Sequence, residues 1–506
     1  MTPLTPIERF LLLLSAGLAT FMIVLDYSIA NISIPYIAGD LGVSNDQGTY
    51  VITSFAVGNA IGLAATGWLT KRIGPVRLII LSILLFTFFS WTCGLSANLT
   101  MLVISRFIQG LVAGPVIPLS QSLIVAFAAP HTRSRDIAIW STIIIVAPVV
   151  GPILGGYISD WYFWTWIFYI NIPIGLLCAL VLWLIMRKHE LGREKTPIDI
   201  PGLVLLTLGV TCLQILLDKG QEWDWWNSYR IRALAIGSFI SFTFLAIQET
   251  WHKNPFLNVR LLSNASYAVS IICLMVSYGV YFGTIVIVPL WLQEYMNYHV
   301  EWAGIAVSAL GIAPILFGML SPWVMKKIGA VATLATAFLL FGGGCFYSAF
   351  FTTDVDIQHV AFGRFLFGFG FIFYLNPLIN LSIQDIPIQQ LPNATGMFHF
   401  VRAMMGAVGT SIFTTFWVRR TIFYHQRIGE LLTPFNPFTP QARDPQSLQN
   451  LNDLMDQQAA MLAINDAFYM MGWLFMGLVV LLLFYLFLKG KEASQPQPVE
   501  GVSASD

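Results

Sequence analysis

The feature of this sequence that most restricts its fold is a succession of long apolar segments separated by short polar stretches. Each segment approaches the roughly 20 apolar residues that cross a bilayer as a helix, and the chain contains about fourteen of them, the first at 10–37 and the last at 467–488. Only 10% of the 506 residues are charged, against about 25% in soluble domains. We therefore predict an all-α integral membrane protein with about fourteen transmembrane helices.

The positions of the basic residues predict the orientation of these helices. Lysine and arginine are enriched in the cytoplasmic loops of membrane proteins. With the N-terminus in the cytoplasm, most basic residues outside the helices fall on the cytoplasmic side, and so does the C-terminus. We therefore expect both termini in the cytoplasm, with Arg419 and Arg420 as an exception on the outer side. The formal net charge of +0 gives no indication of a nucleic-acid partner.

Two internal matches indicate that the helices form a repeat. Residues 67–74 (GWLTKRIG) resemble residues 322–329 (PWVMKKIG), and residues 105–110 (SRFIQG) resemble residues 363–368 (GRFLFG). Both offsets are roughly 255 residues, and both map one helix onto the helix eight places later. We therefore predict four regions: 1–190 as a first six-helix half, 191–255 as two inserted helices, 256–490 as a second six-helix half with a periplasmic loop at 419–466, and 491–506 as a disordered cytoplasmic tail.

The segment 419–466 is the longest stretch outside the predicted helices. Its second part carries apolar residues spaced three, four and seven apart, which is typical of one face of a helix. These residues are Leu448, Leu451, Leu454, Met455 and Leu462. Such a helix either packs on the bundle as a lid or forms a docking surface for a periplasmic partner.

Asp26 is the only acidic residue well inside the predicted helices. A carboxylate within a membrane is costly, and an ion pathway or a proton relay is the usual reason for one. The opposing effects of burial and of a nearby cation would let such a group exchange a proton near neutral pH. The alternative is a carboxylate that only ties helices together through hydrogen bonds.

Arg106 is the expected partner of Asp26. At about 1.5 Å per residue, their depths in the membrane differ by only roughly 5 Å, so they can couple directly, through water or through Gln109. The repeat places Phe367 where the first half has Gln109, so we expect the proton chemistry mainly in the first half. The other intramembrane arginines are Arg364 and Arg402.

The predicted fifth helix combines prolines with small residues. Small side chains four residues apart let helices approach closely, and proline bends a helix while it frees backbone carbonyl groups. The residues concerned are Pro148, Gly151, Pro152, Gly155 and Gly156. The pattern fits a moving contact of a transport protein as well as plain helix packing.

A set of aromatic and polar residues in the second half is suited to an adaptable apolar pocket. We predict a substrate cavity lined by Tyr278, Tyr281, Phe282, Tyr374, Asn376, His399, Phe400 and Arg402. A stripe of this kind also occurs on lipid-facing and core surfaces. His399 is either a second proton carrier or a histidine at a helix contact.

The sequence contains no HExxH, no GxSxG, no phosphate-binding loop and no clustered pair of carboxylates. We therefore expect neither an enzyme nor an ATP-driven pump, and accordingly no catalytic residue, no metal site and no cofactor. A proton gradient is the expected energy source. The five cysteines lie in apolar segments without a CxxC pattern, which indicates packing residues.

Three motifs together resemble the signatures of a known family. They are residues 25–31 (LDYSIAN) with Asp26 and Asn31, residues 105–110 with Arg106, Gln109 and Gly110, and residues 151–156 (GPILGG). The chain resembles the fourteen-helix drug:proton antiporters of the major facilitator superfamily, and the EmrB-like exporters among them, from residue 15 to residue 488. One departure is the loop between the second and third helices, where Lys71 and Pro75 replace an acid and an arginine of the superfamily pattern. Asp136 is the expected substitute acid.

The resemblance implies a proton-coupled antiporter of the bacterial inner membrane that exports hydrophobic drugs and toxicants by alternating access through a central cavity. It also implies two partners, a periplasmic adaptor of the EmrA type and an outer-membrane channel of the TolC type. One alternative is an exporter of an endogenous metabolite such as a siderophore, lipid or fatty acid. Another is a membrane scaffold or sensor that transports nothing.

Overall fold

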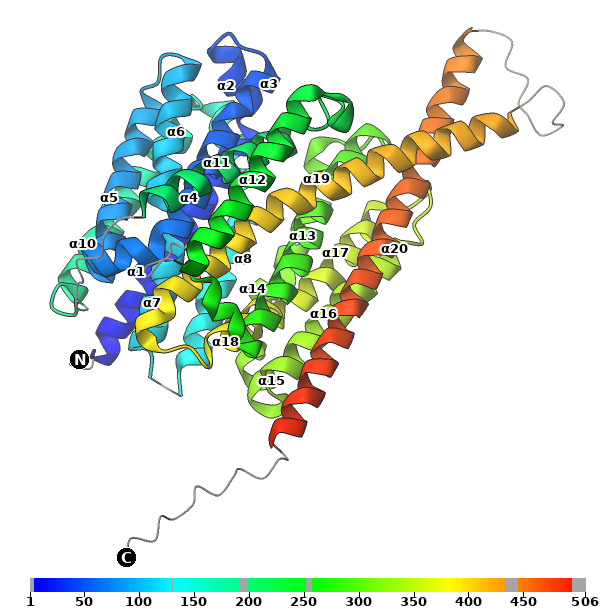
Figure 1. The fold of residues 1–506 in the computed structure, drawn as a ribbon. Helices are drawn as coiled ribbons and strands as arrows, with labels where there is room; N and C mark the ends of the chain where they lie inside the picture. Colours follow the sequence, from blue (N-terminus) through cyan, green and yellow to red (C-terminus); the bar gives the residue numbers. More distant parts are fainter. Residues whose placement is uncertain (1–3, 130, 191–198, 252–256, 433–444, 494–506) are drawn as a thin grey trace, which may run out of the picture.

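The computed structural model describes residues 4–129, 131–190, 199–251, 257–432 and 445–493, and within them the regular secondary structure is helical (Figure 1). The first helices are α1 (Pro6–Ile32), α2 (Ile34–Asp40), α3 (Asn45–Gly48), α4 (Tyr50–Ile73), α5 (Pro75–Gly94), α6 (Leu99–Ala113), α7 (Val116–Phe127), α8 (Arg133–Trp161), α9 (Trp166–Tyr169) and α10 (Asn171–Met186). The later helices are α11 (Ile200–Lys219), α12 (Tyr229–Trp251), α13 (Ala265–Glu294), α14 (Val300–Phe317), α15 (Leu320–Ile328), α16 (Ala330–Ser348), α17 (Ile357–Ile372), α18 (Leu375–Ile383), α19 (Leu391–Leu431) and α20 (Pro445–Ala493).

Polar side chains explain where several helices begin. Thr5 caps α1 and forms a reciprocal pair with Glu8, whose carboxylate accepts a hydrogen bond from the Thr5 backbone at 2.8 Å. Asn98 before α6 and Asn264 before α13 each accept a hydrogen bond from a backbone N–H three residues later. These side chains satisfy backbone donors that have no partner within the helix.

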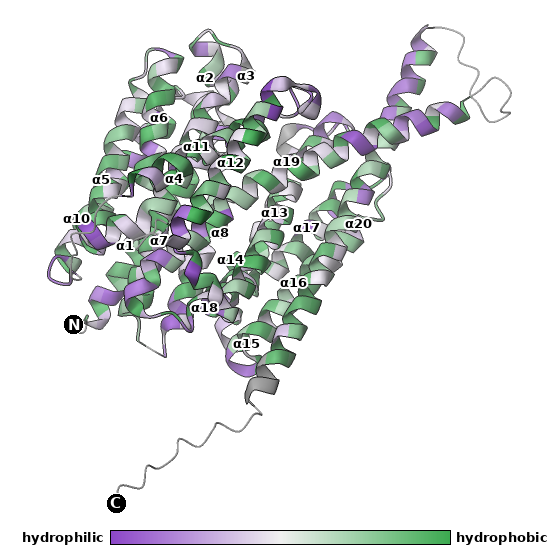
Figure 2. Cartoon of the chain, in the orientation of Figure 1, coloured by the Kyte–Doolittle hydropathy of each residue, from purple (hydrophilic) through white to green (hydrophobic). Residues whose placement is uncertain are grey.

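The helices confirm the prediction of an all-helical membrane protein. Among the described residues, 11 helices are long and apolar enough to cross a membrane, or 12 if the bent pair α14 and α15 forms one span. Figure 2 shows hydrophobic residues along most of the bundle. The long helices α8 and α19, with 29 and 41 residues, are not among these 12.

Among the described residues, one helix that the sequence predicts as continuous is sharply bent. The predicted helix at 302–325 consists of α14 and α15, whose axes differ by 69°. Pro314 lies in the last turn of α14, where it removes one backbone donor. By contrast, α6 and α7 together form the single span Leu99–Phe127, which confirms the helix predicted at 99–128, although Gly114 and Pro115 interrupt its regular helix.

The loops between α4 and α5 and between α15 and α16 have nearly the same backbone geometry. Gly74 ends α4 with φ 95° and ψ 146°, and Gly329 ends α15 with φ 84° and ψ 164°. Residues with a Cβ atom rarely adopt such a positive φ. The two glycines occupy matching places in residues 67–74 and 322–329, so their geometry accords with an internal repeat.

The helices gather in two groups. Figure 1 shows α1, α4 to α7 and α10 on one side of the bundle and α13, α16, α17 and α20 on the other, and α8 packs mainly on α1 while α18 packs mainly on α13 and α16. α19 crosses between the groups and packs on α4 and α7 as well as on α13 and α20. α11 and α12 pack on each other, and α11 also packs on α4.

The segment 419–466 is helical in its described parts, as predicted for its second part but not for its first. α19 continues to Leu431 and α20 begins at Pro445, while residues 433–444 between them lie outside the described part. Of the tail predicted at 491–506, the first three residues belong to α20 and residues 494–506 lie outside the described part. The ends of both helices protrude beyond the bundle and carry many hydrophilic residues (Figures 1 and 2). Arg420 Nη2 lies 2.5 Å from Asp466 Oδ2, and Tyr424 donates a hydrogen bond to the same oxygen at 2.7 Å. These contacts join the two helices and give Arg420, a predicted exception to the distribution of basic residues, an acidic partner.

Candidate functional site

Asp26 and Arg106 form a buried ion pair between α1 and α6. Nη1 of Arg106 lies 2.5 Å from Oδ2 of Asp26, and both side chains are 0% exposed. Nε of Arg106 also donates a hydrogen bond to the Val51 carbonyl at 3.4 Å. The structure thus brings together, without a bridging group, the two residues that the sequence places at similar depth.

Three uncharged polar residues complete this cluster. Asn171 Nδ2 of α10 donates to Oδ1 of Asp26 at 2.7 Å, and Gln109 Nε2 of α6 donates to the same oxygen at 3.4 Å. Gln109 Oε1 accepts from Nη1 of Arg106 at 2.8 Å. Ser90 of α5 accepts from Gln109 at 2.6 Å and from Asn171 at 3.1 Å. Four helices therefore contribute to one hydrogen-bonded cluster.

Neither Asn171 nor Ser90 is a predicted site residue. Serine and asparagine are common at contacts between membrane helices, so their presence in an apolar segment does not distinguish a site residue from a packing residue. The only available signal is a polar side chain inside each of two apolar segments. Only the contact between α5, α6 and α10 brings these side chains to the carboxylate.

Aromatic rings enclose the arginine. The guanidinium carbon of Arg106 lies 4.3 Å from the ring centre of Phe55 and 5.3 Å from that of Phe168. Nη2 of Arg106 is buried without a hydrogen-bond partner among the described residues. Aromatic rings therefore cover the cation on two sides. Within the cluster, Asp26 is its anionic partner.

A carboxylate in this setting can take up a proton and lose its charge. Arg106 would then be an uncompensated cation within the membrane, which is energetically costly. The helices that carry the two residues can lower this cost by separating, so that the cation reaches water or another polar group. The cluster therefore has the chemical means to link protonation to helix movement.

Two glycines of α8 allow a close approach to α1 beside Asp26. A Cβ at Gly151 would lie 2.4 Å from Oγ of Ser28, and a Cβ at Gly155 would lie 3.1 Å from the carbonyl oxygen of Ile29. Any larger side chain at Gly151 would push the two helices apart. Because these glycines set the distance between α8 and α1 beside Asp26, they can affect the position of α1 at the ion pair.

The other residues of the predicted fifth-helix motif differ in their surroundings. Pro152 has no N–H group, so the carbonyl of Pro148 lacks its usual helical partner, and the Ser28 hydroxyl donates to this carbonyl at 3.4 Å. The side chain of Pro152 lies outside the described part. A Cβ at Gly156 would meet nothing within 4 Å, and Asn31 at the end of α1 is exposed.

Gly110 belongs to a second close approach, that of α6 to α4. A Cβ at Gly110 would lie 2.2 Å from the carbonyl oxygen of Phe55. This contact lies one helical turn from Arg106 and fixes the distance between the two helices. Phe55, which packs on the guanidinium, is held by the same contact.

Three of the aromatic residues predicted to line a substrate cavity are core residues. The ring centre of Tyr281 lies 4.5 Å from that of Phe371, and the Tyr374 hydroxyl lies 2.7 Å from the Ser277 hydroxyl. Both tyrosines are buried. Phe400 is also buried in the hydrophobic core.

Tyr278, Phe282 and Arg402 form a second group where α13 packs on α19. The two rings are partly exposed, and their centres lie 4.9 Å apart. The guanidinium carbon of Arg402 lies 5.3 Å from the ring centre of Tyr278. Of the predicted cavity residues, Tyr278 and Phe282 combine partial exposure with an aromatic surface, and Arg402 beside them is buried.

His399 and Asn376 link the two groups of helices. Nε2 of His399 lies 2.6 Å from Oε1 of Gln121 in α7, and its ring meets that of Trp140 edge-on at 5.9 Å. Asn376 Nδ2 donates to the Ser134 hydroxyl of α8 at 3.5 Å. This geometry matches the expected alternative of a histidine at a helix contact.

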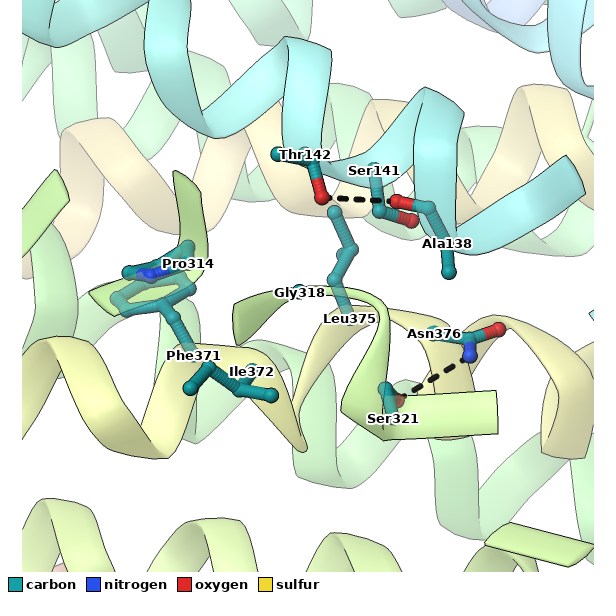
Figure 3. A pocket seen from close by; sticks show the side chains of 10 residues that line it. All are labelled: Ala138, Ser141, Thr142, Pro314, Gly318, Ser321, Phe371, Ile372, Leu375 and Asn376. Atoms are coloured by element: carbon teal, nitrogen blue, oxygen red, sulfur yellow. Dashed lines mark hydrogen bonds between the residues drawn. The ribbon is translucent and has the colours of Figure 1, made fainter. Parts of the chain in front are cut away.

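A narrow crevice follows the same seam. Figure 3 shows it between Ser141 and Thr142 of α8 and residues of α14, α17 and α18. On its far side, Asn376 donates a hydrogen bond to Ser321 at 3.2 Å. Leu375 and Phe371 supply an apolar lining, so the crevice has both polar and apolar walls.

Asp218 is an acidic residue of the membrane-spanning part that the sequence analysis does not single out. It lies at the end of the span Ile200–Lys219. Its carboxylate accepts a hydrogen bond from Gln214 at 3.1 Å and another from the Thr53 hydroxyl of α4. α11 is thereby bonded to the first group of helices.

The loop between α4 and α5 uses a different acid from the one predicted. The Glu190 carboxylate accepts hydrogen bonds from the backbone of Val76 at 3.2 Å and of Arg77 at 3.1 Å. Asp136 instead pairs with its neighbour Arg135 at 3.3 Å. The dipole of α5 favours a negative charge at the start of the helix. The sequence of the loop does not show that Glu190 supplies this charge. Within the described residues no group of three or more His, Cys, Asp or Glu side chains could hold a metal ion.

Comparison with known proteins gives a consistent result. Residues 16–410 match the model of the Major Facilitator Superfamily. The chain is 40% identical over 484 residues to the multidrug export protein EmrB of Haemophilus influenzae, which covers 94% of this chain and 95% of that protein. It is 37% identical over 475 residues to the fatty acid resistance protein FarB of Neisseria gonorrhoeae, which covers 92% and 94%.

A solved structure agrees on the fold. The human organic anion transporter MFSD10 matches with a TM-score of 0.58 at 13% identity, over 94% of this chain and 100% of that chain. At this identity the likeness concerns the fold alone. The chain belongs to the major facilitator superfamily and, within it, to the EmrB-like proteins, and it is a multi-pass protein of the bacterial inner membrane.

Proposed function

We propose that this chain is a proton-coupled antiporter that exports hydrophobic drugs and toxicants across the inner membrane. The observation that carries the proposal is the ion pair of Asp26 and Arg106, whose side chains are 0% exposed inside the helix bundle. Similarity along nearly the whole chain to a protein named for multidrug export supports the substrate class. The proton gradient is the proposed energy source, without a cofactor.

In the proposed mechanism, Asp26 carries the proton and Arg106 stabilises its ionised form. When Asp26 is protonated, the pair weakens and α1 moves relative to α6 and α10. Because α1 packs on α8 at Gly151 and Gly155, the movement reaches the crevice between the two groups of helices and alternates access. One proton that crosses about 100 mV provides roughly 2.3 kcal/mol, enough for about a fiftyfold substrate gradient.

The proposed topology has fourteen membrane helices in the order six, two and six. It counts the 11 apolar helices, the bent pair α14 and α15 as one, α8 and α19. α11 and α12 are the inserted pair. An even number of spans puts both termini on one side, and the excess of basic residues favours the cytoplasm.

The protruding ends of α19 and α20 are the proposed contact for a periplasmic adaptor of the EmrA type, which would join an outer-membrane channel of the TolC type. In the proposed topology these ends lie in the periplasm. Leu448 and Leu454 are 54% and 57% exposed there, and exposed apolar side chains outside the membrane support a protein contact. Replacing both with serine should reduce co-purification with the adaptor, whereas equal recovery of the adaptor would contradict the proposed contact.

The test of the proposed function is export driven by a pH gradient in proteoliposomes. Asp26→Asn keeps the size of the side chain but cannot release a proton, so proton-driven export should stop while the protein elutes normally in gel filtration. Asp218→Asn is the matched control, because its carboxylate lies outside the cluster, and it should continue to export. Export by Asp26→Asn at the rate of the unaltered protein would overturn the proposal.

A second candidate function is export of an endogenous amphipathic metabolite. It is favoured by the 37% identity to FarB, which is named for fatty acid resistance. The same proteoliposomes distinguish the candidates through competition. Inhibition of drug export by a fatty acid, with export of the labelled acid itself, would favour the second candidate.

A further inference from the structure

The loop between α4 and α5 and its repeat between α15 and α16 share a backbone geometry but not their neighbours. Gly74 and Gly329 end the preceding helices with φ 95° and 84°. In both loops the next helix begins directly after the glycine, so its first N–H groups have no acceptor within the helix. Both helix starts therefore present backbone donors that require an outside partner.

A carboxylate is that partner in the first half. The two oxygens of Glu190 accept hydrogen bonds from the backbone of Val76 at 3.2 Å and of Arg77 at 3.1 Å. Nε of Arg77 lies 3.6 Å from the same carboxylate. A Cβ at Gly74 would collide with the Glu190 carboxylate, so the acid fills the space beside the glycine. The start of α5 is thus a place that binds an anionic group.

The corresponding place in the second half is open. The repeat aligns Val76 and Arg77 with Val331 and Ala332. Among the described residues, no side chain caps α16, and the N–H groups of Val331 and Ala332 have no acceptor. A Cβ at Gly329 would meet nothing within 4 Å. The second half therefore has the same donors and free space beside them, without an acid of its own.

Two lysines lie next to this open helix start. Lys326 and Lys327 belong to the last turn of α15, just before Gly329. Both are exposed, and the ion pairs of the described residues include neither of them. Nζ of Lys327 lies 3.9 Å from the ring centre of Trp323, one turn earlier. Two positive charges and the positive end of the α16 dipole thus meet at one turn of the chain, which favours an anion there.

The side chains that flank these lysines are apolar and exposed. Trp323 is 58% exposed and Ile328 is 50% exposed. In the first half the corresponding Trp68 is only 9% exposed, since Leu203 of α11 packs against it. Figure 1 shows α15 at one end of the bundle, and its axis turns by 69° from that of α14. A short helix that leaves a membrane span with tryptophan and lysine side chains is typical of the membrane surface.

We propose that the start of α16, together with Lys326 and Lys327, binds the phosphate group of an anionic phospholipid. The phosphate accepts hydrogen bonds from the first N–H groups of α16, as the Glu190 carboxylate does from those of α5. The acyl chains of the lipid lie along Trp323 and Ile328. The lysines repel a headgroup that carries its own cation, so the site selects lipids with a net negative charge. This site goes beyond the proposed export function and does not depend on it.

The test counts lipids bound to the full chain in detergent by native mass spectrometry. The probes are dioleoyl-phosphatidylglycerol and dioleoyl-phosphatidylcholine, which share acyl chains and a phosphate but differ in net charge. We expect phosphatidylglycerol to bind about tenfold more tightly at one site. Replacing both lysines, Lys326→Gln with Lys327→Gln, should weaken phosphatidylglycerol binding roughly 10- to 30-fold and leave phosphatidylcholine binding unchanged.

A proline variant tests the backbone donors while both lysines stay in place. Val331→Pro removes one N–H group at the second position of α16, a position that Pro201 occupies in α11. It should weaken phosphatidylglycerol binding several-fold. Unchanged binding in Val331→Pro would show that the lysines attract the lipid without the helix start, which overturns the proposed site.

Arg187→Gln is the matched control for the lysines. Arg187 also lies over an exposed tryptophan, with its guanidinium carbon 4.9 Å from the ring centre of Trp183, but no helix begins directly after it. This variant should bind phosphatidylglycerol as the unaltered protein does. Equal losses in Arg187→Gln and in the double lysine variant would reduce the effect to general attraction between basic residues and anionic lipid, and overturn the assignment.

The unaltered protein alone also decides the proposal. Equal affinity for the two lipids overturns it even if every variant fails to fold. Free glycerol 1-phosphate shares the anionic phosphate but has no acyl chains. If it displaces phosphatidylglycerol at equal concentration, the ligand is a free anion and the assignment to a lipid is wrong.

Discussion

Arg106 and Arg364 occupy matching positions in the segments 105–110 and 363–368, yet their surroundings differ. Arg106 meets a carboxylate at 2.5 Å, whereas Arg364 donates to a backbone carbonyl at 3.0 Å. Where the first segment has Gln109, which bonds to Asp26, the second has Phe367, whose ring centre lies 4.5 Å from that of Phe341. One region is a hydrogen-bonded polar cluster and the other a cluster of aromatic rings.

The backbone packing of the two regions is nevertheless the same. A Cβ at Gly110 would lie 2.2 Å from the Phe55 carbonyl oxygen, and a Cβ at Gly368 would lie 2.2 Å from the Leu310 carbonyl oxygen. The repeat therefore preserves how helices approach each other, while the side chains that could carry a charge have diverged. This difference separates a region suited to proton chemistry from one suited to packing.

The largest effect is expected from breaking the ion pair. Arg106→Met leaves Asp26 buried without its cation, which should cost about 3–5 kcal/mol of folding free energy. Arg364→Met removes only a hydrogen bond to a carbonyl and should cost about 1–3 kcal/mol. Thermal unfolding of the purified proteins in detergent measures both. The double variant Asp26→Asn with Arg106→Met should recover part of the loss, and equal costs for the two single arginine variants would contradict the comparison.

The shared packing predicts equal effects in the two regions. Gly110→Ala and Gly368→Ala each force a methyl group against a backbone carbonyl, so each should destabilise the protein by about 1–3 kcal/mol. Gly343→Ala is the control, because a Cβ there would meet nothing within 4 Å. The same unfolding assay applies. A large effect in one region alone would show that the repeat does not preserve the packing.

The sequence predicts the central ion pair of the polar cluster, but not the residues that surround it. Apolar length identifies most of the helices, and a charge inside an apolar segment is rare enough to single out Asp26 and Arg106. The sequence does not predict the roles of Asn171 and Glu190, because polar residues of these types are common and only tertiary contacts bring them to their partners. The length of an apolar run likewise cannot reveal that α19 extends to Leu431, since its last turns carry polar residues, of which Arg420 contacts α20.

A smaller effect, on transport rather than stability, is expected at the contact between α1 and α8. Gly151→Ala would press a methyl group on the Ser28 side chain, which can move, so we expect export to slow several-fold with little loss of stability. Gly156→Ala is the matched control in the same helix, because a Cβ there meets nothing within 4 Å. Proton-driven export in proteoliposomes measures both. Equal rates for the two variants would contradict a role of this contact in coupling.

The smallest effect is expected at the exposed ion pair of Arg420 and Asp466. Its nitrogen and oxygen are 2.5 Å apart, as in the buried pair, but its side chains are 40% and 31% exposed. Water screens such a pair, so Arg420→Gln should cost only about 0.2–1 kcal/mol and leave proton-driven export unchanged. The same unfolding and export assays test this, with Arg106→Met for comparison. If Arg420→Gln destabilised the protein as much as Arg106→Met, burial would not be what distinguishes the two pairs, and the assignment of the proton step to the buried one would lose its physical basis.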